Sequence, residues 1–186
     1  MIYSWKKIVK NSIPILTIAV FIEIFAGQIL QGNQEKLLLF PIFLISIPVI
    51  NGVGGNIGSI LGARLASGLH VGYIELTIKD KNIQKNFLTS LLMGLITYAI
   101  LGILIYYIAY FGNIQMEIDL LVFVSIVLGT GVLLILMISI ISVLTAFLAF
   151  KKGLDPDDMV APVVTTFGDT LGIVLLFLLI GVVGIW

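Results

Sequence analysis

Long apolar stretches with at most one charged residue each alternate with short polar stretches along this chain, and the alternation predicts its elements. Five apolar runs approach or exceed the roughly 20 residues that a helix needs to cross a bilayer core of about 30 Å. They cover residues 12–30, 37–66, 87–111, 120–150 and 160–185. None has the alternating period of a β-barrel strand. The pattern therefore predicts an all-α integral membrane protein with five transmembrane helices.

Composition agrees with this prediction and narrows the chemistry. Of the 186 residues, 60% are hydrophobic and 11% are charged, against about 25% charged in an average soluble domain. We expect one membrane domain over residues 1–186, without a soluble regulatory domain. The absence of cysteine excludes disulfides and thiolate metal sites, and the single histidine, His70, is expected at the surface. With so few sulfur and imidazole groups, oxygen atoms remain as metal ligands. No pairing of a nucleophile with a base is evident, so we expect that the protein is not an enzyme.

The lysines predict how the chain is oriented in the membrane, because cytoplasmic loops are enriched in lysine and arginine. They gather in clusters on one side of the predicted spans: Lys6, Lys7 and Lys10; Lys79, Lys81 and Lys85; Lys151 and Lys152. We therefore expect a multi-pass protein of the cell membrane with a cytoplasmic N-terminus and with Trp186 outside. The net charge is zero, so no basic surface indicates nucleic acid as a partner.

Asp169 is the one charged side chain between residues 160 and 186. An aspartate in the middle of a membrane helix costs roughly 2.5–3.5 kcal/mol, and such residues usually have a function. The helical spacing places small or polar residues on the same face: Pro162, Thr165, Thr166 and Gly172. The rest of the helix is then expected to face lipid. The alternative is a structural role, in which Asp169 bonds to a neighbouring helix or to a distant base such as Arg64.

Glu23 is a second carboxylate at membrane depth, within the apolar run of residues 12–30. Two interpretations stay open. The carboxyl group is either protonated or paired with a hydroxyl group of another helix, or it takes part in transport. As an ion site we rank Glu23 behind Asp169.

Asp155 and Pro156 are typical of a helix start, with the aspartate as N-cap and the proline at the first helical position. This structural role does not exclude a second role for Asp155, in ion binding. Asp155 precedes Asp169 by 14 residues, which places the two carboxylates near the same helical face about 21 Å apart.

The run of residues 37–66 contains prolines and clustered glycines. Three glycines repeat at every fourth position and form a ridge on which another helix can pack closely: Gly54, Gly58 and Gly62. Alternatively, the prolines and glycines loosen the helix and expose backbone carbonyls to a wet cavity. In that case Asn51, Asn56 and Ser59 would face the cavity.

Carboxylate, amide and hydroxyl oxygens without soft ligands favour hard cations such as Mg²⁺, Ca²⁺ or Mn²⁺. Mg²⁺ keeps most of its water shell and is often held by one or two carboxylates. One carboxylate per chain suggests two chains. A homodimer with its two-fold axis along a pore would bring both copies of Asp169 to one ion.

Two segments resemble the paired signatures of a known family. They are NGVGGNIG at residues 51–58 and DPDDMVAPVVTTFGDTLG at residues 155–172. In this order they resemble the membrane domain of MgtE-type magnesium transporters, and they look closer to its animal solute-carrier branch and archaeal relatives than to bacterial MgtE. The resemblance implies a homodimeric Mg²⁺ transporter or channel with its pore at the dimer interface. In it, Asp169 matches the central ion-binding aspartate, Asp155 the aspartate at the cytoplasmic mouth, and Asn56 the asparagine of the glycine-rich helix.

The chain departs from the bacterial pattern at two points. About eleven residues precede the first predicted helix, where bacterial MgtE has a large cytoplasmic sensing part. Ile60 stands where the bacterial motif commonly has glutamine. Animal relatives fuse two such units, so this chain would need a second copy.

The sequence thus predicts a Mg²⁺ transporter or channel, with these residues as ligands along the ion path: Asp169, Asp155, Asn56, Thr165 and Thr166. The expected partners are a second copy of the chain, the bilayer and divalent cations, with Mg²⁺ as the bound and transported ion. One alternative is a Na⁺- or H⁺-coupled exchanger in which Glu23 and Asp169 are alternately protonated. The other is a non-transporting membrane subunit that binds a partner through the glycine ridge.

Overall fold

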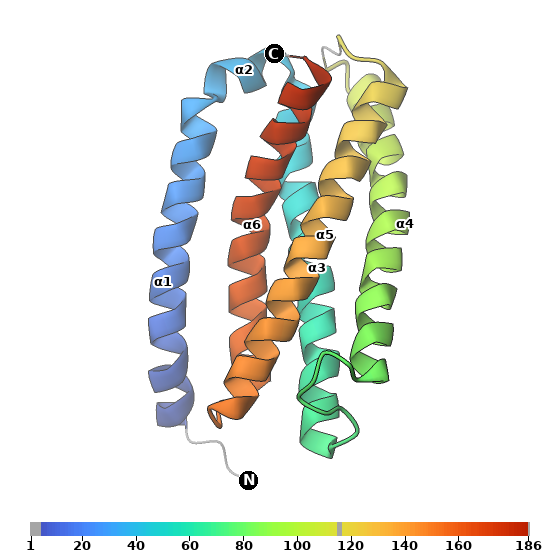
Figure 1. Ribbon diagram of the computed structural model, residues 1–186. Coiled ribbons are helices and arrows are strands. Elements are labelled where there is room, and N and C mark those ends of the chain that lie inside the picture. Colours follow the sequence, from blue (N-terminus) through green and yellow to red (C-terminus); the bar gives the residue numbers. More distant parts are fainter. Residues whose placement is uncertain (1–4, 115–116, 186) are drawn as a thin grey trace.

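The computed structural model describes residues 5–114 and 117–185, and the elements in these residues are all helices (Figure 1). They are α1 (Trp5–Gly32), α2 (Gln34–Leu39), α3 (Pro41–Val71), α4 (Lys81–Phe111), α5 (Leu120–Lys151) and α6 (Pro156–Val183). Five of them, α1 and α3 to α6, are long and apolar enough to cross a membrane. The prediction of an all-α protein with five spanning helices is therefore confirmed. Trp186, which we expected outside the cell, lies outside the described residues.

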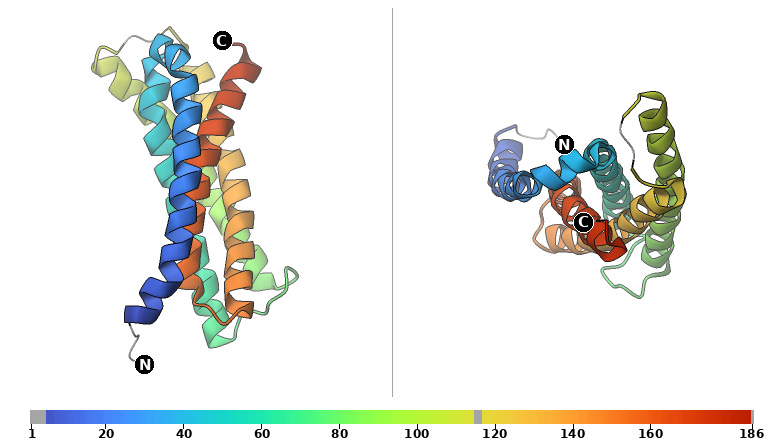
Figure 2. Two further views of the ribbon diagram at one scale, coloured as in Figure 1. Left: turned by 90° about the vertical axis from the view of Figure 1, so that its left-hand side faces the viewer. Right: turned by 90° about the horizontal axis from the view of Figure 1, so that it is seen from above.

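The short helix α2 was not predicted, and the expectation of one helix over residues 37–66 is wrong at its start. Pro41 occupies the first turn of α3 and supplies no backbone N–H to continue a preceding helix. Phe40 before it has a non-helical backbone, with φ −130° and ψ 74°. The chain therefore breaks at residue 40, and α2 runs from the end of α1 to the start of α3 (Figure 2).

The spanning helices extend past the apolar runs into polar sequence. Helix α3 continues to Val71 and ends at Gly72, whose φ of 82° suits glycine. Helix α4 begins at Lys81, because the carboxylate of Asp80 accepts hydrogen bonds from the first backbone N–H groups of the helix. The predicted helix start after Asp155 is confirmed, since its side chain accepts a hydrogen bond from the backbone N–H of Asp157.

Helix α6 lies inside the bundle and packs against α1, α3 and α5 (Figures 1 and 2). The expectation that most of α6 faces lipid is therefore wrong. Its apolar side chains fill the core next to α3 and α5, with Val164, Leu176 and Ile180 fully buried. In contrast, α1 stands at the edge of the bundle along α6, and its apolar side chains are mostly exposed.

The glycine ridge of α3 packs inside the chain, as the close-packing interpretation predicts. A Cβ atom at Gly54 would meet Leu134 of α5, and one at Gly58 would meet Ile138 of α5 and Val164 of α6. Both glycines are buried, and so is Gly62. The ridge is thus occupied by the chain's own helices, so the idea that it binds a partner is wrong. The alternative interpretation, in which the prolines and glycines loosen the helix, is wrong, because α3 is helical without a break through Pro48 and the glycines.

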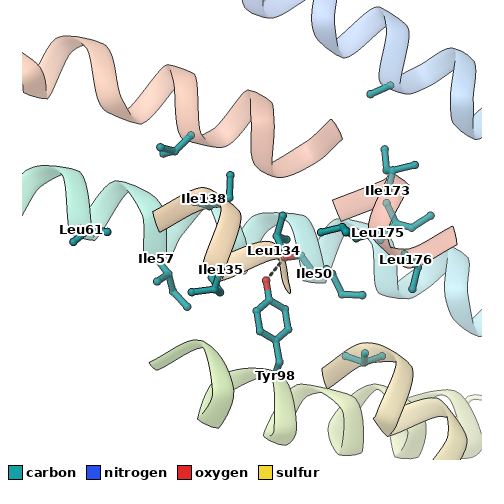
Figure 3. Close-up of a cluster of buried hydrophobic side chains, with 14 of the residues drawn as sticks. Ile50, Ile57, Leu61, Tyr98, Leu134, Ile135, Ile138, Ile173, Leu175 and Leu176 are labelled. Carbon is teal, nitrogen blue, oxygen red and sulfur yellow. Dashed lines mark hydrogen bonds between the residues drawn. The ribbon is translucent and has the colours of Figure 1, made fainter. Parts of the chain in front are cut away.

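Buried polar groups tie α4 and α5 to the backbone of α3. Tyr98 of α4 is fully buried against Gly131, and its hydroxyl donates a hydrogen bond of 2.7 Å to the carbonyl oxygen of Ile50 (Figure 3). The Ser142 hydroxyl of α5 donates to the carbonyl oxygen of Gly58 at 3.0 Å. In a bilayer no water competes for such groups, so these bonds fix the helices that support α6.

Candidate cation site

Asp169 lies midway along α6, where α3 crosses it closely. The side-chain Nδ2 of Asn51 on α3 donates a hydrogen bond of 3.0 Å to the backbone carbonyl oxygen of Asp169. Two glycines of α6 make room for this contact, since a Cβ at Gly168 would approach the backbone of Gly55 and one at Gly172 would overlap the Oδ1 of Asn51. The position of the Asp169 backbone is therefore set by direct contact with α3.

Asp169 is half-buried, and polar residues of α6 and α3 at the same helix crossing are exposed. Thr165, one turn before it on α6, is exposed and packs against Gly55 of α3. Asn56, the next residue of α3, is exposed as well. These three residues flank the point where α3 and α6 cross at Gly55 and Gly168, and we call Asn56, Thr165 and Asp169 the open face. Its polar groups come from the two segments that resemble the family signatures.

The hydroxyl group of Thr165 has spare capacity as a ligand. Its Oγ1 donates back to the carbonyl oxygens of Ala161 at 2.9 Å and of Pro162 at 3.2 Å. These contacts use only its hydrogen, so the oxygen can still accept a hydrogen bond or ligate a cation. The open face thus offers a carboxylate, a hydroxyl and an amide oxygen, which are donors that hard cations prefer.

Asn51 does not face a cavity, so that expectation is wrong. The residue is only 6% exposed and lies between α3 and α6. Its Oδ1 has no hydrogen-bond partner and rests against Gly172. Sequence reasoning missed this packing of Asn51 against α6, although Gly168 and Gly172 form a small-xxx-small pair that marks a close helix crossing. Ser59, the third residue of that expectation, is half-buried.

Thr166 points towards α1 and not to the open face. It is only 3% exposed, and its Oγ1 donates to the carboxylate Oε1 of Glu23 at 3.4 Å. This contact is the pairing with a hydroxyl group of another helix that one of the two interpretations of Glu23 expects, and it does not by itself exclude the other. Glu23 is an exposed residue, and Thr166, to which it is bonded, is three residues before Asp169 on α6. Two carboxylates from distant parts of the chain thus lie near one another.

Two other charged residues lie far from this site. Arg64 is exposed and is 13 residues beyond Asn51 on α3, about 20 Å along the helix, so it does not pair with Asp169. Asp155 caps α6 at 14 residues before Asp169, about 21 Å away. Within residues 5–114 and 117–185, no group of three or more histidine or acidic side chains comes together in one chain.

Comparison with known proteins identifies the family. Residues 47–179, which contain the glycine-rich helix and the Asp169 segment, match the sequence model of MgtE, described as a divalent cation transporter. The match covers more than half of the chain. The chain belongs to the MgtE family of divalent cation transporters. The MgtE match thus includes most of α3 and α6 and all of α4 and α5.

The MgtE-family chain is also similar to curated animal proteins. It is 31% identical over 179 residues to mouse solute carrier family 41 member 2, a match that covers 89% of this chain and 30% of the relative. It is 30% identical to the human member 2 over the same length. Identity to mouse solute carrier family 41 member 3 is 26% over 196 residues, with 94% of this chain and 40% of the relative covered. The chain therefore spans less than half the length of these relatives.

Proposed function

We propose that this chain is a Mg²⁺ transporter or channel whose ion path runs between two copies of the chain, along the open face. Asp169 is the central ion site, with Thr165 and Asn56 beside it on the path. Thr166, which the sequence placed on the path, is buried towards α1 and is not part of the proposed ligand set. Asp155 attracts the cation at the cytoplasmic mouth, with the N-terminus inside.

The observation that carries the proposal is the open face itself. Asp169, Thr165 and Asn56 lie at membrane depth on the outer surface of the single chain, with no cationic side chain beside Asp169 among the described residues. A carboxylate that faces hydrocarbon costs roughly 2.5–3.5 kcal/mol. A second copy related by a two-fold axis covers this surface with the same surface, and it brings two copies of Asp169 together. A divalent cation between them offsets the charge of both.

The donors suit Mg²⁺ better than a soft metal. Mg²⁺ dehydrates reluctantly, so two carboxylates hold it while the hydroxyl and amide groups bind its waters. Such a site favours Mg²⁺ over Na⁺, since a divalent ion has a larger Coulombic attraction to two carboxylates than a monovalent ion has. The side chains need to move little, because the contact between Asn51 and α6 fixes the helix backbone at this level.

The direct test is Mg²⁺ uptake by the purified protein in liposomes, comparing wild type with Asp169→Ala. Glu35→Gln, an acid on α2 outside the path, serves as the control. We expect uptake in wild type and Glu35→Gln and none in Asp169→Ala, with all three folded by circular dichroism. Unchanged uptake in Asp169→Ala contradicts the assignment. A dependence of uptake on an opposing Na⁺ or H⁺ gradient would identify the coupled exchanger.

A further inference from the structure

We propose that Glu23 is a second cation-binding residue of the path, which holds the hydrated ion from the side of α1 next to Asp169. This inference rests on the proposed function. It adds a carboxylate from the first helix, which lies outside the segment that the family match covers.

The first argument is the placement of charge. Beyond the first and last two turns, the five spans carry three charged side chains: Arg64, which lies far from Asp169 along α3, and the two acids Glu23 and Asp169. The two acids come from opposite ends of the chain. Helix α1 packs on α6, and Thr166, which bonds to Glu23, is three residues before Asp169 on the same helix. Two like charges at membrane depth repel one another and are costly to hold. A bound cation turns this repulsion into attraction.

The second argument is that packing alone does not explain the side chain. The Thr166 hydroxyl donates one hydrogen bond of 3.4 Å to the Oε1 of Glu23, and a neutral glutamine would accept the same bond. Next to this contact, α1 and α6 leave an apolar cavity of about 170 Å³, which Thr166 also lines. A tightly packed structural role is therefore a poor account of the carboxylate of an exposed residue. The negative charge needs a separate reason.

Geometry assigns different tasks to the two acids. Asp169 belongs to a backbone that α3 fixes through Asn51, whereas Glu23 is on the peripheral helix α1 and reaches the same level through a longer side chain. Because Mg²⁺ keeps most of its waters, Glu23 can hold the ion through the water shell without displacing Asp169. Glu23 then raises the affinity of the path for divalent cations, and Asp169 remains essential for passage.

The experiment measures Mg²⁺ uptake against Mg²⁺ concentration for wild type, Glu23→Gln, Glu23→Asp and the control Glu35→Gln. Glutamine keeps the acceptor for Thr166 and removes the charge, and aspartate keeps the charge. Loss of one charge-assisted interaction raises the apparent KM about tenfold or more in Glu23→Gln. We expect Glu23→Asp to stay closer to wild type, and Glu35→Gln to match it.

The outcomes separate this inference from the proposed function. If wild type transports Mg²⁺ and Glu23→Gln has the KM of Glu35→Gln, Glu23 is only a hydrogen-bond acceptor and the inference is overturned. If wild type and Glu35→Gln transport no Mg²⁺, the proposed function itself fails. Should Glu23→Gln not fold, Glu23→Asp decides, because a KM equal to that of wild type supports a role of the charge and a loss equal to that of Asp169→Ala contradicts it.

Discussion

The side-chain amide of Asn51 on α3 donates a hydrogen bond to the backbone carbonyl oxygen of Asp169 on α6, at 3.0 Å. The bond joins the two segments that carry the family signatures. It also fixes the position from which the Asp169 side chain leaves the helix, without using its carboxylate. The carboxylate therefore stays available to a cation while the backbone beneath it is held.

The packing of Asn51 against Gly172 of α6 predicts the effect of adding one methyl group at residue 172. Gly172→Ala places a Cβ in contact with the Oδ1 of Asn51, and such overpacking costs about 1–3 kcal/mol. Gly181 on the same helix has no neighbour within 4 Å of that position, so Gly181→Ala should be neutral or slightly stabilising. Thermal unfolding in detergent compares the two variants. Equal stability of Gly172→Ala and Gly181→Ala would show that Asn51 does not pack against Gly172.

The proposed interface predicts a pattern of cross-linking in this cysteine-free chain. Asn56→Cys on the open face should give a dimer with a short bis-maleimide reagent, because two copies meet there. Ile100→Cys is 53% exposed on α4, on another surface, and should remain monomeric. Gel electrophoresis after cross-linking in membranes measures both. Dimers from Ile100→Cys alone would place the interface on α4 and contradict the proposed path.

Asp80 predicts a pH dependence in the connection between α3 and α4. The carboxylate of Asp80 accepts a hydrogen bond of 2.9 Å from the backbone N–H of Glu75. It also accepts hydrogen bonds from the backbone N–H groups of Asn82 and Ile83, and these bonds together hold the pKa of Asp80 below its usual value. A lowered pKa in the folded state means that the ionised Asp80 stabilises the fold above its ordinary pKa. This stabilisation is lost as the pH falls through the lowered pKa. Hydrogen exchange of residues 72–83 should therefore speed up below about pH 4. Asp80→Asn should exchange fast already at neutral pH, and equal protection in that variant would contradict this account.

The spans could be predicted from the sequence because apolar length alone determines them. Their ends could not, since α3 and α4 continue into polar residues that helix caps such as Asp80 and Gly72 support. The break at Phe40 was missed because it falls inside an apolar run, where only Pro41 marks it. Periodicity places residues on helix faces, and caps and prolines decide where the helices stop.

The candidate site was predicted in part. The sequence placed Asp169 and Thr165 on one face of α6, and the structure agrees. It did not foresee that Asn51 is buried or that Thr166 turns to Glu23, because both depend on which helix lies beside α6. Hydrophobic patterning separates buried from exposed faces, but it does not name the neighbouring helix.

The measurement that tests the central claim most directly is the protection of Thr165→Cys by Mg²⁺. In the cysteine-free chain, a charged, membrane-impermeant thiol reagent labels this cysteine only if water reaches the open face. Leu104→Cys, 49% exposed on α4, is the lipid-facing control and should not react. We expect Thr165→Cys to be labelled, Mg²⁺ to slow the labelling, and the added substitution Asp169→Asn to abolish that protection. Labelling that Mg²⁺ does not slow, or protection that survives Asp169→Asn, would contradict an ion path with Asp169 at its centre.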